Sequence, residues 1–217
     1  MKYSLNLERR AVWLAALIQL VNAVDFMIIM PLGADLSRNL NISAAWIGYL
    51  GGSYTLAAAI SSFLIAKHID KYDRKSVAIF SLFGLSVATL FCANAWNMES
   101  LLFARILAGI FAGPSGSIAL AIVSDCVPVG RRGKAMAIVM GAFSIAAIAG
   151  VPLGVKLAEK YGWASPFYVV SMSAFIVVLL IVSLLPKLVT HIPENLVNQK
   201  DLSVANLLAL RVFAWND

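Results

Sequence analysis

Residues 11–31 read AVWLAALIQLVNAVDFMIIMP, an apolar run interrupted by a single charge at Asp25. A helix that crosses the hydrocarbon core of a bilayer needs about 20 consecutive, mostly apolar residues. Five further stretches of this kind follow, at about 45–66, 76–95, 100–124, 135–157 and 166–186. Because backbone amides in lipid must be paired within their own segment, these stretches are expected to be helices. The alternating segments of about 10 residues that build a membrane β-barrel are absent.

The composition excludes a soluble fold. Of the 217 residues, 61% are hydrophobic and 13% are charged, against about 45–50% and 25% in soluble domains. The mean hydropathy is +0.86. We therefore predict an all-α membrane protein of six transmembrane helices, with an N-terminal segment at 1–10, a bundle at 11–187 and a tail at 188–217. A short amphipathic segment at about 203–214 either lies on the membrane surface or begins a longer region.

The distribution of basic residues predicts the orientation. One side of the predicted topology holds Lys2, Arg9, Arg10, Lys67, Lys71, Arg74, Lys75, Arg131, Arg132, Lys134, Lys187, Lys200 and Arg211. The other side holds only Arg38, Lys156 and Lys160. Because Lys and Arg accumulate on the cytoplasmic side, both termini are predicted to be cytoplasmic. The net charge of +6 follows from this asymmetry, and no nucleic-acid partner is expected.

Signs of cofactor or enzyme chemistry are absent. Cys92 and Cys126 fall at opposite ends of adjacent spans, so no disulfide is expected between them. The sequence has no CxxC or Cys/His cluster, so we expect no metal, and no P-loop, so we expect no ATP site. HExxH and GxSxG motifs and paired carboxylates within the spans are also missing. We therefore expect the protein not to be an enzyme.

Asp25 and Arg105 are charged residues inside apolar stretches. A charge in hydrocarbon costs about 2.5–3.5 kcal/mol on insertion scales, so each should face a cavity or a partner. Counted at about 1.5 Å per residue from the same side, the two lie at similar depth. A pair would lower both costs, and protonation of Asp25 would free Arg105 to bind an anion or a carbonyl. The alternatives are a permanent structural pair or, for Asp25, a place near the outer interface.

Two further patterns concern the loops and the glycines. The loop 66–75 is dense in both charge signs, as expected of a solvated cytoplasmic turn. Gly109 with Gly113, and Gly150 with Gly154, are small-xxx-small pairs that let helix backbones approach closely. Pro152 removes a backbone donor and can bend its helix.

Read together, these residues resemble the N-terminal six-helix domain of the major facilitator superfamily. The loop is similar to the family signature G-x-x-x-D-R-x-G-R-K, with Asp70 at the acidic position and Arg74 and Lys75 at the basic pair. It departs at three positions, which hold Ala66, Lys71 and Asp73. Asp73 replaces a glycine and adds a negative charge beside Arg74.

Other motifs fall on the matching spans. Asp125 matches the acid that pairs with the loop arginine in the family, which implies an Arg74–Asp125 contact. Arg105, Gly109 and Gly113 match R-x-x-x-G-x-x-x-G, and the stretch from Asp25 to Pro31 resembles D-x-x-x-x-x-P. The following residues resemble the antiporter motif, in the form typical of the drug:proton antiporter and sugar-efflux branch: Gly141, Gly150, Pro152 and Gly154.

The resemblance covers about residues 10–187 and implies a secondary transporter of the plasma (bacterial inner) membrane. It would export a small organic molecule, such as a drug, sugar or nucleoside, in exchange for protons. In the family, the first and fourth helices line the central cavity, which places Asp25 and Arg105 there. Further candidates on the first helix are Asn22, Met27 and Met30. The loop with Asp125 would form a cytoplasmic gate.

The family normally has two six-helix halves with a substrate site between them. We therefore expect a truncated chain, a separately encoded second half or a homodimer, of which truncation is favoured. The alternative to transport is a membrane protein that does not transport alone and serves as an assembly partner.

Overall fold

The computed structural model of the chain describes residues 5–40, 43, 45–69, 72–186 and 188. Within this part of the chain the regular elements are helices. They are α1 (Leu5–Met27), α2 (Gly33–Leu40), α3 (Ala45–Ile69), α4 (Arg74–Ala93), α5 (Met98–Cys126), α6 (Val129–Ile145), the π-helical segment η1 (Ala146–Gly150), α7 (Val151–Tyr161) and α8 (Ser165–Leu184). Six spans are long and apolar enough to cross a membrane, because α6, η1 and α7 form one continuous span. The predicted fold class, an all-α bundle of six transmembrane helices, is confirmed.

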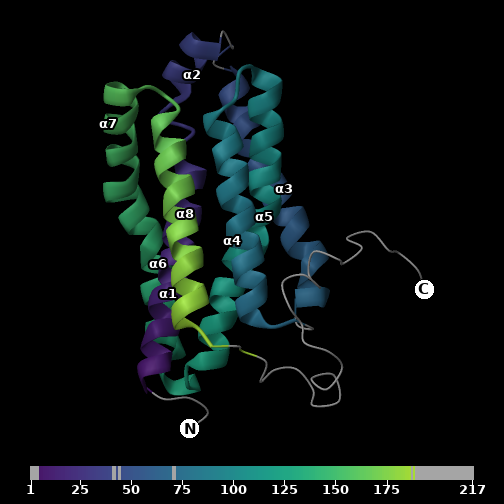
Figure 1. The fold of residues 1–217 in the computed structure, drawn as a ribbon, viewed down its shortest axis with the longest axis vertical. Helices are drawn as coiled ribbons and strands as arrows, with labels where there is room; N and C mark the ends of the chain where they lie inside the picture. Colours follow the sequence, from purple (N-terminus) through teal and green to yellow (C-terminus); the bar gives the residue numbers. More distant parts are fainter. Residues whose placement is uncertain (1–4, 41–42, 44, 70–71, 187, 189–217) are drawn as a thin grey trace, which may run out of the picture.

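The long helices run side by side and form an upright bundle (Figure 1). Helix α5 lies at its centre and packs against α1, α3, α4 and α6, while α8 packs against α4 and α1. Local sequence fixes where several helices begin and end. Asn97 and Ser100 form a reciprocal capping box at the start of α5, which satisfies amides that the first helical turn leaves unpaired. Gly162, at φ +92°, ends α7 and turns the chain into α8.

The helix bounds differ from the predicted stretches in three places. Helix α1 begins at Leu5 rather than at about residue 11, since the polar residues before the apolar run extend the helix beyond the hydrocarbon region. The fifth span runs from Val129 to Tyr161 instead of 135–157. The short helix α2, which was not predicted, lies at the end of the bundle opposite the N-terminus (Figure 1).

The predicted tail begins with an ordered contact. Leu188 is fully buried against the main hydrophobic core, so packing continues past the expected boundary at residue 187. The amphipathic segment predicted at 203–214 lies outside the described residues.

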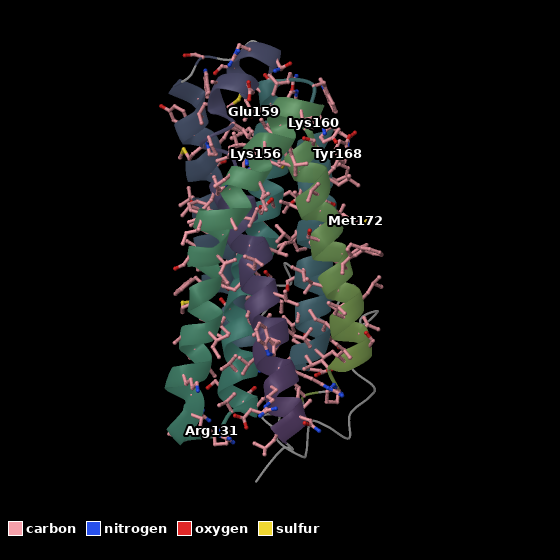
Figure 2. All side chains as sticks on the ribbon, turned by 90° about the vertical axis from the view of Figure 1, so that its left-hand side faces the viewer. Arg131, Lys156, Glu159, Lys160, Tyr168 and Met172 are labelled. Atoms are coloured by element: carbon pink, nitrogen blue, oxygen red, sulfur yellow. The ribbon has the colours of Figure 1, made fainter. Side chains whose placement is uncertain are left out.

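Basic residues occupy both ends of the bundle. Figure 2 shows Arg131 at the end where the N-terminus lies, and Lys156 and Lys160 toward the opposite end. At the first end, Arg131 Nη2 makes an ion pair with Glu8 Oε2 at 2.7 Å, which ties the start of α6 to the start of α1.

Candidate functional site

Asp25 of α1 and Arg105 of α5 meet in the interior of the bundle. Arg105 Nη1 lies 3.3 Å from Asp25 Oδ2, and neither side chain is exposed at all. The same nitrogen donates to the backbone carbonyl of Asp25 at 3.2 Å. Because an isolated charge is costly in lipid, mutual neutralisation explains how both residues sit between apolar helices.

Two further residues contact this pair. Thr89 of α4 donates its hydroxyl to Asp25 Oδ1 at 2.9 Å, so both carboxylate oxygens are engaged. The guanidinium carbon of Arg105 lies 4.1 Å from the ring centre of Tyr54 on α3, a cation–π geometry. The pair is therefore held by residues of four different helices.

Arg105 has more donors than the protein uses. Among the described residues, its buried Nε and Nη2 atoms make no hydrogen bond to an oxygen or nitrogen atom, and the Cys92 thiol is the further polar group close to the guanidinium. Buried donors are nearly always paired, so unpaired ones call for an explanation such as a bound group or water. In the described part of the chain, two donors of a fully buried guanidinium are thus left without an oxygen or nitrogen acceptor.

The other predicted cavity residues divide between the interior and the surface. Asn22 is buried and accepts a hydrogen bond from Ser115 Oγ of α5 at 2.8 Å. Met27 is half-buried, and Met30 is exposed. The structure therefore brings Asn22 to the interface of α1 and α5 together with Asp25, but it does not gather the two methionines there.

At the other end of the bundle, Arg74 at the start of α4 contacts Asp125 near the end of α5. Arg74 Nε lies 3.0 Å from Asp125 Oδ2, with 8% and 22% of the two side chains exposed. Lys75 Nζ donates to the carbonyl of Val182 near the end of α8 at 2.7 Å, where a cation complements the unpaired carbonyls of the helix terminus. Asp70 lies outside the described residues.

Asp73, which replaces a glycine of the signature loop, is the N-cap of α4. Its Oδ1 accepts from Lys75 N at 3.2 Å and from Leu188 N at 2.7 Å, and its Oδ2 accepts from Ser76 Oγ at 3.3 Å. The added negative charge is thus taken up by three donors and anchors the segment that follows α8.

The glycines have different roles. A Cβ at Gly109 or Gly113 would collide with the carbonyl oxygens of Tyr54 and Ala58, so these two glycines bring α5 against α3. Cβ atoms at Gly150 and Gly154 would collide with Val24 and Ile28, so that pair brings the fifth span against α1.

Gly141 faces open space, and therefore does not serve helix packing among the described residues. Pro152 lies in the first turn of α7, directly after η1, and is exposed. In this continuous span a proline removes a backbone donor, and it lies directly after the π-helical segment, where the hydrogen-bond pattern already departs from that of an α-helix.

Sequence reasoning missed Tyr54, Thr89 and Ser115. All three are neutral polar residues within apolar runs, a pattern that carries little signal because such residues are common in membrane helices. Of the residues in this region, only Asp25, Arg105 and Asn22 were predicted.

Comparison with known proteins identifies the family. The model of the Major Facilitator Superfamily matches residues 15–215. The chain belongs to this superfamily. Among proteins similar to it, the aspyridones efflux protein of Neocamarosporium betae is 33% identical over 147 residues, which are 68% of this chain and 26% of that protein.

Solved structures share the fold of this superfamily member. One is a bacterial homologue of the human lysosomal transporter Spinster, inward-facing and unoccupied, with a TM-score of 0.74 and 20% identity over 85% of this chain and 44% of that one. Another is the human organic anion transporter MFSD10, with a TM-score of 0.71 and 22% identity over 87% and 49% of the two chains. The chain thus spans less than half the length of these superfamily structures.

Proposed function

We propose that this chain is the N-terminal six-helix half of a transporter that exports a small organic molecule in exchange for protons. Membership of the superfamily and similarity to a protein named for efflux support export. The observation that carries the proton coupling is the fully buried Asp25–Arg105 pair, because it joins an acid that can take up a proton to a base that keeps its charge.

The proposed step is an exchange of partners at Arg105. While Asp25 is ionised, its carboxylate holds Arg105 Nη1. Protonation of Asp25 removes the negative charge and weakens this contact. Nη1 then joins Nε and Nη2, which have no oxygen or nitrogen acceptor among the described residues, and the guanidinium can bind an acceptor on the substrate. For exchange, Asp25 releases its proton to the cytoplasm while the substrate is bound. After the cavity has opened outward, the ionised carboxylate retakes Arg105 and displaces the substrate.

The proposed architecture includes a second six-helix half. In the superfamily, substrate sites lie between two halves, and the chain covers 44% and 49% of the two structures described above. A separate second half or a second copy of this chain would cover the face that the substrate uses. Both termini are proposed to be cytoplasmic, in the plasma membrane, with the Arg74–Asp125 contact on the cytoplasmic side.

Reconstitution tests the coupling. The purified chain is placed in proteoliposomes that contain a pH-sensitive dye, and drugs, sugars and nucleosides are offered in turn. We expect a solute to drive proton movement, and Asp25→Asn to reduce that movement to background. Asp35→Asn is the matched control. It makes the same change in the short helix α2 at the end of the bundle, where Asp35 pairs with Arg38 on the surface. A monodisperse chain that moves no solute would contradict transport by this chain alone and favour an assembly partner.

A further inference from the structure

A groove runs along the outside of the bundle between the fifth span and α8, on the face that Figure 2 turns toward the viewer. It has a volume of about 190 Å³. Its floor is formed by residues within 20–28 of α1, and its two walls by residues within 150–157 of the fifth span and 166–173 of α8. Because Leu153 on one wall and Val169 on the other are both exposed, the groove opens toward the surroundings of the bundle.

The lining of the groove is almost wholly apolar. Among the described residues that line it, Ser173 alone has a polar side chain. Its hydroxyl donates to the carbonyl of Val169, one turn earlier on α8, at 2.8 Å, so this group is already paired within its own helix. A polar group that is buried without a hydrogen bond is destabilised, and the side chains of this lining offer it no partner. The groove therefore suits a hydrocarbon chain rather than a polar solute.

The dimensions of the groove match one acyl chain. At about 1.5 Å per residue, the floor at 20–28 is about 12 Å long, and half of a hydrocarbon core is about 15 Å thick. One end lies near the turn between α7 and α8, so the groove covers most of one leaflet. A further helix with its side chains is about 10–12 Å wide. Because α7 and α8 pack against each other and are joined directly by 162–164, only a thinner molecule reaches the floor at α1.

Cationic side chains lie at the end of the groove away from the N-terminus (Figure 2). Lys160 follows Leu157 of the groove wall by less than one turn of α7, and Lys156 lies one turn before Lys160. Lys160 Nζ is 5.2 Å from the ring centre of Tyr161, an exposed aromatic residue of the kind enriched at the level of lipid headgroups. At about 3.6 residues per turn, Glu159 lies about 200° around α7 from Leu157, on the side away from the groove. The charge at this end therefore favours an anionic headgroup.

We propose that this groove binds one phospholipid, with an acyl chain along the α1 floor and the phosphate group at Lys156 and Lys160. The apolar lining holds the chain, and the lysines select an anionic headgroup over a zwitterionic one. Binding of this lipid is separate from the proposed transport, since the groove residues make no contact with the buried pair of Asp25 and Arg105 among the interactions described above.

Native mass spectrometry of the purified, delipidated chain in detergent tests the proposal. The probes are dioleoylphosphatidylglycerol, dioleoylphosphatidylcholine and glycerophosphoglycerol, which is the first headgroup without acyl chains. Ser173→Phe fills the groove. Its matched control is Ser183→Phe, because Ser183 is also on α8 and donates in the same way to the carbonyl of Leu179, at 2.6 Å. Lys160→Gln is matched by Lys134→Gln, which removes an exposed lysine near the other end of the fifth span.

We expect the wild type and Ser183→Phe to bind one phosphatidylglycerol ahead of any further lipid, and Ser173→Phe to lose it. Lys160→Gln should reduce the preference for phosphatidylglycerol over phosphatidylcholine by about 5-fold, the contribution of one basic residue near a membrane surface. Lys134→Gln should keep this preference. Glycerophosphoglycerol should not bind the wild type, a result that needs no variant to fold.

Three results would overturn the proposal. Retention of the first lipid in Ser173→Phe would place it outside the groove. Binding of glycerophosphoglycerol as tight as that of the lipid would leave only a phosphate site. A wild-type dimer that binds no lipid would assign the groove to a second copy of the chain.

Discussion

Leu188 donates its backbone amide to Asp73 across 115 residues of sequence, at 2.7 Å. The contact joins the start of α4 to the segment that follows α8, and Arg74 N reinforces it by donating to the carbonyl of Leu188 at 3.5 Å. The end of the sixth span is thereby fastened to the charged loop between the second and third spans. The residue that departs from the glycine of the family signature makes this connection.

Removal of the Asp73 carboxylate should destabilise both the start of α4 and the segment that contains Leu188. We expect Asp73→Ala to lower the free energy of unfolding by about 1–3 kcal/mol, because a helix cap and a charged hydrogen bond are lost together. Hydrogen exchange at Leu188 should quicken in this variant. Asp73→Asn, which keeps an acceptor oxygen, should retain most of the protection. Ser76→Ala removes only the 3.3 Å contact to Oδ2 and serves as the control. Unchanged exchange at Leu188 in Asp73→Ala would contradict the fastening role.

The buried pair should show strong coupling in stability. Asp25→Ala alone leaves Arg105 uncompensated, which costs about 3–5 kcal/mol. Combining it with Arg105→Leu removes both charges, so the double variant should be more stable than the sum of the single changes predicts, by about 0.5–3 kcal/mol. Chemical unfolding in micelles measures the stability of the wild type, the two single variants and the double variant. Additive losses would show that the two charges do not interact.

The contact between α3 and α5 should not tolerate a larger residue at Gly113. A Cβ there collides with the Ala58 carbonyl, Ser61 and Ser62, and backbone atoms cannot yield as a flexible side chain does. We expect Gly113→Ala to destabilise the bundle by about 1–3 kcal/mol. Gly52→Ala, which adds a methyl group into open space, should change stability by less than about 0.5 kcal/mol. Equal melting temperatures for the two variants would argue against a tight α3–α5 interface.

The contact at the charged loop should respond to charge reversal. Arg74→Asp or Asp125→Arg alone places like charges together at a largely buried position, whereas the double reversal restores opposite signs. We expect the double variant to recover part of the lost stability, of the order of 1.5–3 kcal/mol for a charged hydrogen bond.

The Arg131–Glu8 pair gives the matched comparison. The Arg131 side chain is 51% exposed there, so a double charge reversal of this pair should recover less than about 1 kcal/mol of stability. Similar recoveries at the two sites would mean that burial does not strengthen the Arg74–Asp125 contact.

Hydropathy predicted the six spans because each apolar run is long and contains at most one charged residue, but it could not predict their ends. Leu5 to Arg10 joins α1 despite its charges, since a helix continues into water once its backbone is ordered. The helix α2 was missed because an eight-residue polar segment carries no membrane signal. Its Leu36 becomes fully buried only when the long helices are in place.

The site was predictable as far as charge marks it. Asp25 and Arg105 could be paired from their depth in the membrane alone, since both lie a similar number of residues from the same end of the bundle. Thr89 and Tyr54 could not be assigned, because these helices are apolar on all sides and the sequence does not show which face turns inward. Their roles depend on the rotation of α3 and α4 against α5, which close contacts such as those of Gly109 determine.

The π-helical segment η1 controls the angular phase of the fifth span. A π turn holds one residue more than an α turn, so residues 146–150 turn the chain about as far as four α-helical residues would. Ile148 is 78% exposed, and its loss would remove little packing. Its deletion should let the segment close into an α turn and leave Gly154 facing Ile28, which a cysteine crosslink between positions 28 and 154 would detect as a retained bond. Deletion of one residue from the α-helical part of α6 should rotate α7 by about 100° and lose that bond.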